Sequence, residues 1–244
     1  TSRERVLTAL DHKEPDRVPV DFGGTTVTGM HVSCVTALRE YYGLARHPVK
    51  VIELGQCLGE IEEDLKELLG LDVDAVTRPR SKWGYPNAEF KPWRMTDGLE
   101  VLAPGGYAYT VDTNGDILIH PQGDLSAPPS ARMPNDGYFF DSIIRQEPID
   151  EDKLDPADNL EEFGPVPDED FAAMKEMIAR SKAKGRFVMA AIGGTGFGDI
   201  ANVPAPGLKH PKGIRDITEW YISTTSRRSY VYEVFERQAQ IALA

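Results

Sequence analysis

The sequence predicts an α/β fold whose core strands run parallel. Two helix patterns are each followed directly by a short apolar strand pattern: Gln56–Leu69 precedes Asp74–Thr77, and Asp168–Lys184 precedes Phe187–Ile192. The segment Thr1–Val20 has the same order, with a short helix pattern before an extended stretch. Helices that alternate with strands in this way are typical of parallel sheets covered by helices.

The beginning of the chain predicts a capped helix and then a first strand. Thr1 and Glu4 have the spacing of a capping box, and the apolar residues that follow recur at helical spacing. Pro15 ends this helix because a proline disfavours the helical conformation of the residue before it. We expect Arg17–Val20 to be extended and Asp21 to lie on the loop that follows.

Two further helices and a second strand are predicted before residue 80. Val35, Leu38 and Tyr42 lie at helical spacing, and a glycine follows them as a stop signal. In Gln56–Leu69 the apolar residues share one face, and acidic residues occupy much of the rest. Asp74–Thr77 then has the pattern of a buried strand.

The pattern changes at about Lys82, where short strand patterns alternate with turn residues. The expected antiparallel strands lie at residues 90–95, 100–102, 107–113 and 116–120. Asn114 and Gly115 form a strong hairpin signal between the last two. We interpret residues 82–145 as a β-rich hairpin insertion, with an irregular loop over residues 121–134.

The helix and strand pattern resumes in the last third of the chain. Asp168–Lys184 carries an apolar stripe, and Phe187–Ile192 is the clearest buried strand. A glycine-rich loop, Gly193–Gly198, follows this strand directly. Further helix patterns cover residues 214–223 and 226–244.

Composition limits the classes of function. The chain has 244 residues, 41% of them hydrophobic, which is enough for one substantial core. Its net charge of −12 disfavours nucleic acids and anionic membranes as partners, since both attract basic surfaces. The longest apolar run, Phe187–Ile192, is too short to span a bilayer, and two cysteines make no disulfide framework. We therefore expect a soluble cytoplasmic protein, and the sequence leaves a homodimer open.

The acidic residues are concentrated in one stretch. Residues 146–170 contain eleven Asp or Glu and one basic residue, Lys153. No histidine or cysteine lies among them, so we interpret the run as a solvated connection rather than a metal site.

The glycine-rich loop is the sharpest local feature. The backbone of Gly193, Gly194, Thr195 and Gly196 could approach a phosphate or a carboxylate after a buried strand. Residues 196–201 also fit the dinucleotide pattern G-x-G-x-x-A, but no strand-end acidic residue follows at the required distance. The interpretations that stay open are a ligand-lining loop, a tight turn and, with the weakest support, a nicotinamide site.

Charged residues follow the first two predicted strands. Asp21 comes directly after the first, and Arg78 and Arg80 come after the second. Arginine suits the binding of a carboxylate, and an aspartate can accept or donate a proton. These three residues are candidates for a substrate site, with Asp21 as the catalytic group. The alternative is that all three are surface charges on exposed loops.

Two other groups of side chains have alternative interpretations. Trp83, Tyr85 and Trp93 either form the floor of a pocket for a flat ligand or make the small core of the insertion. His31 and Cys34 lie one helical turn apart, so both could reach one zinc ion. Two ligands are not a zinc site, and a helix-start histidine with a packed cysteine is the better explanation of the pair.

Several of these segments resemble the uroporphyrinogen decarboxylase superfamily. The resemblance is strongest at Ser2–Val20, at Gly70–Val76, and at Phe187–Gly198 with Lys209–Gly213 beyond. It implies a (β/α)8 barrel of the TIM type, and only about three of the eight strands are found here. We therefore expect the chain to be the N-terminal part of such a barrel.

The superfamily contains porphyrinogen decarboxylases and corrinoid-linked methyltransferases, and this chain departs from the former. Their loop after the first strand carries arginine that binds carboxylates, whereas Phe22–Thr28 has none. The decarboxylases also have an aspartate seven residues after the position of Asp74, where this chain has Ser81. They have a tyrosine after the strand-end glycine, where this chain has Ala201 or Asn202. Unpaired carboxylates in an enclosed site are costly, so porphyrinogen decarboxylation is disfavoured.

The resemblance therefore favours a methyltransferase in a corrinoid-dependent demethylation system. It implies a small-molecule substrate, a corrinoid or corrinoid protein as partner, and Asp21, Arg78, Arg80 and Gly193–Gly198 at the site. Members of this branch use zinc, but their His-x-Cys ligands belong to the C-terminal half of the barrel, and no such motif occurs here. We assign no metal ligand to this chain. The alternatives are a decarboxylase of a porphyrinogen-like or smaller carboxylate substrate, and a non-catalytic tetrapyrrole-binding protein.

Overall fold

The computed structural model describes residues 1–191 and 199–243. The chain forms two compact units, each assembled from separate segments. The first unit comprises Thr1–Pro79, Asn87–Gly105 and Pro167–Ile192. The second unit comprises Arg80–Pro86, Gly106–Val166 and Gly193–Ala244.

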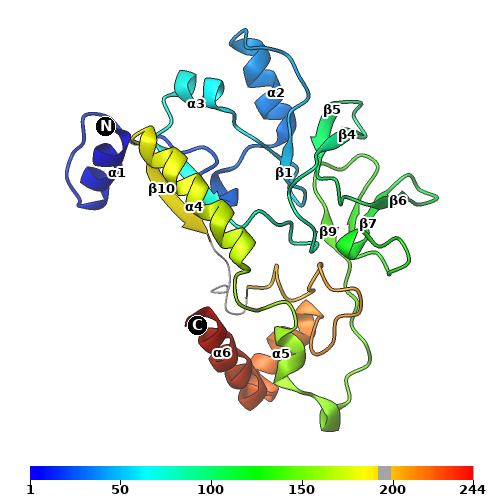
Figure 1. The fold of residues 1–244 in the computed structure, drawn as a ribbon. Coiled ribbons are helices and arrows are strands. Elements are labelled where there is room, and N and C mark those ends of the chain that lie inside the picture. The colour runs from blue at the N-terminus through cyan, green and yellow to red at the C-terminus, as the bar shows by residue number, and fades with distance from the viewer. Residues whose placement is uncertain (192–198, 244) are drawn as a thin grey trace. The chain divides into compact units, whose positions relative to one another are not determined.

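The first unit contains both helices and short strands, most of which are labelled in Figure 1. Its helices are α1 (Ser2–Leu10), the 3-10 helix η1 (Thr26–Thr28), α2 (Val32–Tyr41), α3 (Glu63–Leu69) and α4 (Asp168–Ala183). Its strands are β1 (Val51–Glu53), β2 (Leu58–Gly59), β3 (Val73–Thr77), β4 (Lys91–Arg94), β5 (Glu100–Ala103) and β10 (Phe187–Ala191).

Helix α1 begins with the expected capping box. The Thr1 hydroxyl accepts the N–H of Glu4 at 3.2 Å, and the Glu4 carboxylate accepts from the Thr1 amino group at 2.8 Å. The N–H of Arg3 donates to the carbonyl of Gly185 at 3.0 Å. Helix α1 is thus attached to the residues that immediately precede β10.

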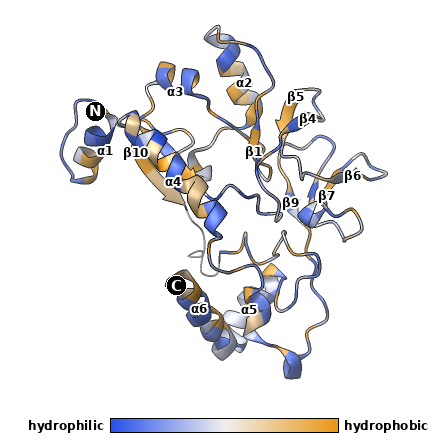
Figure 2. Ribbon diagram, in the orientation of Figure 1, coloured by the Kyte–Doolittle hydropathy of each residue, from blue (hydrophilic) through white to orange (hydrophobic). Residues whose placement is uncertain are grey.

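Strands β3 and β10 form a parallel pair. Phe187 is opposite Val73, and the register continues without a break to Ala191 opposite Thr77. Helix α4 contacts both strands, so the predicted unit of α4 followed by β10 is present. In Figure 2, β10 has the hydrophobic colour, whereas α4 alternates between hydrophilic and hydrophobic residues.

The prediction of a (β/α)8 barrel, or of its N-terminal part, is wrong. The described strands form four separate sheets of two to four strands, and only β3 and β10 pair in parallel. In the described part of the chain no β/α unit repeats eight times and no sheet closes. Residues 17–20, where the first barrel strand is expected, form no strand, and Pro19 in this segment has no N–H to donate to a ladder.

The predicted helix Gln56–Leu69 is present only in its second half. Cys57 has a φ of 50°, which is not helical, and Gly59 pairs with Val51 in the antiparallel sheet of β1 and β2. Helix α3 begins at Glu63 and ends where Gly70 takes the left-handed conformation, with a φ of 64°. The predicted glycine stop is therefore confirmed, but the start of the helix is not.

The antiparallel strands expected after Lys82 are divided between the two units. Strands β4 and β5 form a hairpin in the first unit, where the N–H of Leu102 donates to the carbonyl of Val49 at 2.9 Å. The second unit contains a four-stranded antiparallel sheet in the order β6 (Tyr109–Val111), β7 (Ile117–Ile119), β8 (Ala131–Met133) and β9 (Asp141–Ser142). Gly115 has a φ of 85° in the hairpin between β6 and β7, which confirms the predicted turn.

In its described part, the second unit combines this sheet with two α-helices and three 3-10 helices. Its helices are η2 (Pro121–Gly123), η3 (Glu151–Lys153), η4 (Pro156–Leu160), α5 (Ile217–Ser226) and α6 (Arg228–Leu243). A core cluster joins α5, α6 and η4 through buried side chains that include Leu160, Ile214, Trp220, Val231 and Val234. Among the described residues, no helix is long and apolar enough to cross a membrane.

Candidate functional site

Asp21, the predicted catalytic group, lies in a closed turn. Its Oδ1 accepts the N–H of Gly24 at 2.8 Å, and its Oδ2 accepts the hydroxyl of Thr28 at 3.1 Å. The N–H of Gly23 also donates to the carbonyl of Thr28 at 2.9 Å. Asp21 therefore organises the loop that contains η1, and both of its oxygens already have a hydrogen bond.

A buried carboxylate holds the segment that leads into this loop. Asp72 is fully buried and accepts the N–H of Val20 at 2.9 Å, while its own N–H donates to the Val20 carbonyl. Arg5 and Arg17 donate to the Asp72 carboxylate at 2.5 and 2.9 Å. Arg5 also donates to both oxygens of Asp16.

The hydrogen-bonding and charged partners of Asp72 outweigh the effect of burial on its pKa. Burial by itself raises the pKa of Asp72, but the Val20 N–H, the Ser2 side chain and the two arginines together hold it below its ordinary value. Asp72 is therefore a charged anchor that connects α1 and residues 16–20 to the beginning of β3.

A second acidic residue of β3 is also paired. Asp74 accepts from Lys66 at 2.7 Å, from the Ser181 hydroxyl at 2.6 Å and from Arg186 at 3.4 Å. These partners belong to α3, to α4 and to the residue before β10, so Asp74 connects the helices to the sheet. Both buried acids of this strand thus have structural roles.

The structure does not bring Asp21 and Arg78 together. A Cβ built on Gly24 would lie 2.8 Å from Val73, so the Asp21 turn packs beside the first residue of β3. Arg78 follows the last residue of β3, which places it about 16 Å further along the strand direction. Arg78 instead donates to Asp170 at 3.4 Å, and its side chain is 33% exposed.

The other predicted site residues belong to the second unit. Arg80 pairs with Pro86 through an isolated antiparallel bridge. Gly193, Gly194, Thr195 and Gly196 lie outside the described residues. The proposed grouping of Asp21, Arg78, Arg80 and the glycine-rich loop therefore stays a prediction.

The aromatic residues form parts of cores. Trp83, Tyr85 and Trp93 are each at most 6% exposed. Trp83 contacts Phe140 edge to face, with ring centroids 6.3 Å apart. Trp83 and Tyr85 belong to the second unit and Trp93 to the first.

The histidine and cysteine pair has a structural explanation. His31 precedes α2, and its Nδ1 accepts the N–H of Ser33 at 3.3 Å as a helix cap. In the described part of the chain, no group of three or more His, Cys, Asp or Glu side chains could hold a metal ion. The described residues therefore do not fit a zinc site.

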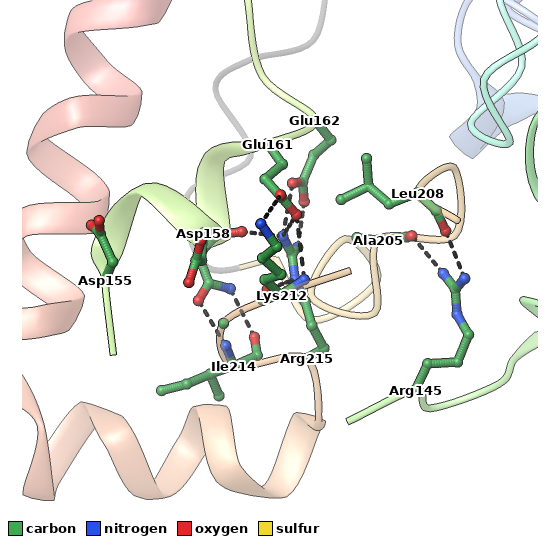
Figure 3. A network of polar contacts seen from close by, with 12 residues as sticks. Arg145, Asp155, Asp158, Glu161, Glu162, Ala205, Leu208, Lys212, Ile214 and Arg215 are labelled. Atoms are coloured by element: carbon green, nitrogen blue, oxygen red, sulfur yellow. Dashed lines mark hydrogen bonds and ion pairs between the residues drawn. The ribbon is translucent and has the colours of Figure 1, made fainter. Parts of the chain in front are cut away.

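Sequence analysis missed a network around two arginines in the second unit, which Figure 3 shows from close by. Arg215 is 1% exposed and forms a bidentate pair with Glu162 at 2.7 and 3.1 Å. It also donates to the carbonyls of Asp158 and Lys212, both at 2.6 Å. Arg215 thus attaches the acidic run to the basic segment that follows residue 208.

Arg145 fixes the adjoining loop through backbone contacts. It donates to the carbonyls of Ala205 at 2.8 Å and Leu208 at 2.6 Å, as Figure 3 shows. Among the described residues it forms no ion pair with a carboxylate. Burial and the nearby charge of Arg215 lower the pKa of Arg145 to about 10.

A small cavity lies beside this network. It measures about 30 Å³ and is lined by side chains that include Asn159, Arg215, Trp220 and Gln238. This volume suits one water molecule rather than a substrate.

The sequence contains one signal that could have indicated the network around Arg215. An acidic run precedes the basic residues Lys209, Lys212 and Arg215, so the two segments have complementary charges.

Comparison of the chain with protein families, with curated proteins and with solved structures finds no match.

Proposed function

We propose that this chain belongs to the uroporphyrinogen decarboxylase superfamily and acts in methyl transfer, in a corrinoid-dependent demethylation system. The resemblance at Ser2–Val20, Gly70–Val76 and Phe187–Gly198 supports the family. The capped helix α1 and the hydrogen bond from Val20 to Asp72 lie within the first two of these segments.

The observation that carries the choice of reaction is the loop after Val20. It contains no arginine or lysine, and its acidic residue, Asp21, closes a turn with Gly24 and Thr28. A substrate with several carboxylates would find no cation on this loop and would lose its hydration without compensation. The loop therefore disfavours a porphyrinogen and leaves a less charged methyl donor as the better substrate.

Two further positions in the second unit support the same conclusion. Ser81 stands where a decarboxylase has its aspartate, and its hydroxyl accepts the N–H of Trp83 at 2.9 Å. Ala201 and Asn202 stand where a tyrosine is expected, and both donate their N–H groups to Asp199, at 3.0 and 2.9 Å. These residues form turns and supply neither a carboxylate nor a phenol.

In this proposal the predicted site residues keep separate roles. Arg78 and Arg80 bind an anionic part of the methyl donor or of the corrinoid, and Asp21 accepts or donates a proton at the reacting group. The proposal keeps Gly193–Gly196 as a candidate ligand-binding segment, which lies outside the described residues. We derive no step through zinc, since the described residues hold no group that fits it.

The test supplies the purified protein with reduced cobalamin as methyl acceptor and with a methyl ether, a methylamine or a methyl thioether as donor. We expect methylcobalamin to form with at least one donor, as measured from the visible spectrum. A parallel assay measures carbon dioxide release from uroporphyrinogen. Carbon dioxide release without methylcobalamin formation would refute the proposal and identify a decarboxylase.

A non-catalytic tetrapyrrole-binding protein is the second candidate, because both oxygens of Asp21 are engaged within its own turn. A carboxylate engaged in this way must give up or share a contact of its own turn before it can contact a substrate. This candidate predicts that cobalamin binds while neither methyl transfer nor carbon dioxide release occurs. Equilibrium dialysis on the same preparation separates it from methyl transfer.

A further inference from the structure

A pocket of about 360 Å³ lies in the first unit, and none of the residues proposed for methyl transfer lines it. Its walls are the last turns of α2, the loop that follows α2 and the turn between β4 and β5. The volume is at the lower end of the range for small-molecule sites in proteins. The pocket therefore suits a ligand of a few heavy atoms.

Buried contacts hold the walls in place. Arg39 is 3% exposed, donates to both oxygens of Asp64 at 2.8 and 3.0 Å, and donates to the Ala45 carbonyl at 3.1 Å. On the other wall, the N–H of Met95 donates to the Leu99 carbonyl at 2.9 Å. A pocket with fixed walls loses less entropy when a ligand binds.

Two opposite charges at this pocket are only weakly paired. The Arg46 side chain is 80% exposed, and Glu40 is the one carboxylate within 4.0 Å of it in the described part of the chain, at 3.5 Å. That distance is longer than a good charge-assisted hydrogen bond. Two other side chains of the pocket have partners: His47 contacts Glu62 at 3.0 Å, and Glu100 pairs with a neighbouring arginine at 2.5 Å.

We propose that this pocket binds a free α-amino acid with an aliphatic side chain. The Arg46 guanidinium has the planar fork that binds a carboxylate through two N–H groups, and Glu40 accepts from an ammonium group. The pocket is also lined by Ala45, Pro48 and Leu99, which offer an apolar surface to the side chain. The inference is independent of methyl transfer, because it uses a different set of residues.

The experiment is a calorimetric titration of the purified protein with L-leucine. N-acetyl-L-leucine lacks the ammonium group, and L-leucinamide lacks the carboxylate, so each removes one of the two charges. We expect L-leucine to bind saturably and each analogue to bind about tenfold more weakly or worse. Equal binding of all three compounds, or no saturable binding up to about 10 mM L-leucine, would overturn the proposal.

Variants locate the binding in this pocket. Arg46→Gln and Glu40→Gln should each weaken L-leucine binding about tenfold, because each removes one charged contact. Arg237→Gln is the matched control, since Arg237 also pairs with a glutamate on an exposed helix surface of the second unit. Both pocket residues are at least half exposed, so their replacement leaves the fold intact. Unchanged affinity in the two pocket variants places the binding elsewhere and refutes the assignment.

Discussion

Asp72→Asn is the substitution that tests most sharply how the first unit is held together. The Asp72 carboxylate is fully buried and accepts from two arginines and from the N–H of Val20. Asparagine keeps the size of the side chain but removes the charge, and its amide group presents donors to the guanidinium donors of Arg5 and Arg17. The variant therefore removes an anion while leaving its cations in place.

The expected loss follows from the contacts of each arginine. A hydrogen bond to a charged group contributes about 1.5–3 kcal/mol, and Asp72 makes such bonds with both Arg5 and Arg17. Arg17 is 43% exposed and regains hydration, and Arg5 keeps its contacts with Asp16. We therefore expect the free energy of unfolding to fall by about 3 kcal/mol, which is the lower end of the sum of two such contacts. For a chain of this length the melting temperature would fall by about 6–12 °C.

The assay is urea denaturation at pH 7, followed by far-ultraviolet circular dichroism. Asp16→Asn is the control, because Asp16 contacts the same Arg5 from a position that is 68% exposed, where water screens the interaction. We expect this control to lose much less stability than Asp72→Asn. Equal unfolding midpoints for the two variants would refute the anchoring role of Asp72.

The difference in stability between wild type and Asp72→Asn should depend on pH. The pKa of Asp72 is held below its ordinary value in the folded protein. Its contribution to stability is therefore complete above the unfolded pKa of about 3.9 and is lost as the pH falls through the lower folded value. The difference in free energy of unfolding between wild type and Asp72→Asn should therefore become smaller below about pH 4. A difference that widens on acidification would contradict this sign.

Three other predictions concern the candidate site and the cysteines. Arg78→Ala and Arg80→Ala should each weaken the binding of methyl donor or cobalamin in equilibrium dialysis, and unchanged affinity would exclude them from the site. Asp21→Asn should keep the melting temperature near that of wild type, because an amide oxygen can still accept a hydrogen bond in the turn. The rate of methyl transfer should fall, and full activity would leave Asp21 a structural role only. Burial raises the pKa of Cys57 to about 12. At pH 8 a thiol reagent should therefore modify the exposed Cys34 rapidly and Cys57 only after unfolding. Rapid modification of both thiols in the folded protein would contradict the burial of Cys57.

Local signals with a stereochemical cause were predictable from the sequence. The capping box depends only on Thr1 and Glu4, whose side chains accept the free N–H groups of the first helical turn. The hairpin turn depends on the positive φ of Gly115, which glycine adopts without strain. Helix α4 and strand β10 also form close to the predicted positions, since the period of their apolar residues decides their type.

Long-range organisation was not predictable in the same way. Gln56–Leu69 has a helical period throughout, but Cys57 is in the left-handed region and Gly59 pairs with a strand. Strand β8 follows two consecutive prolines, so its sequence indicated only a loop. Arg145 and Arg215 are charged and would be expected at the surface, and only the folded chain supplies the carbonyls and the Glu162 carboxylate that make their burial tolerable.

The most direct test of the proposed function compares two tetrapyrroles as ligands of the purified protein. We expect cobalamin to bind saturably. Uroporphyrin, which carries many carboxylates, should bind at least tenfold more weakly, because the loop Phe22–Thr28 offers it no cation. Fluorescence titration for uroporphyrin and equilibrium dialysis for cobalamin measure the two affinities. Tighter binding of uroporphyrin than of cobalamin would contradict the assignment to methyl transfer.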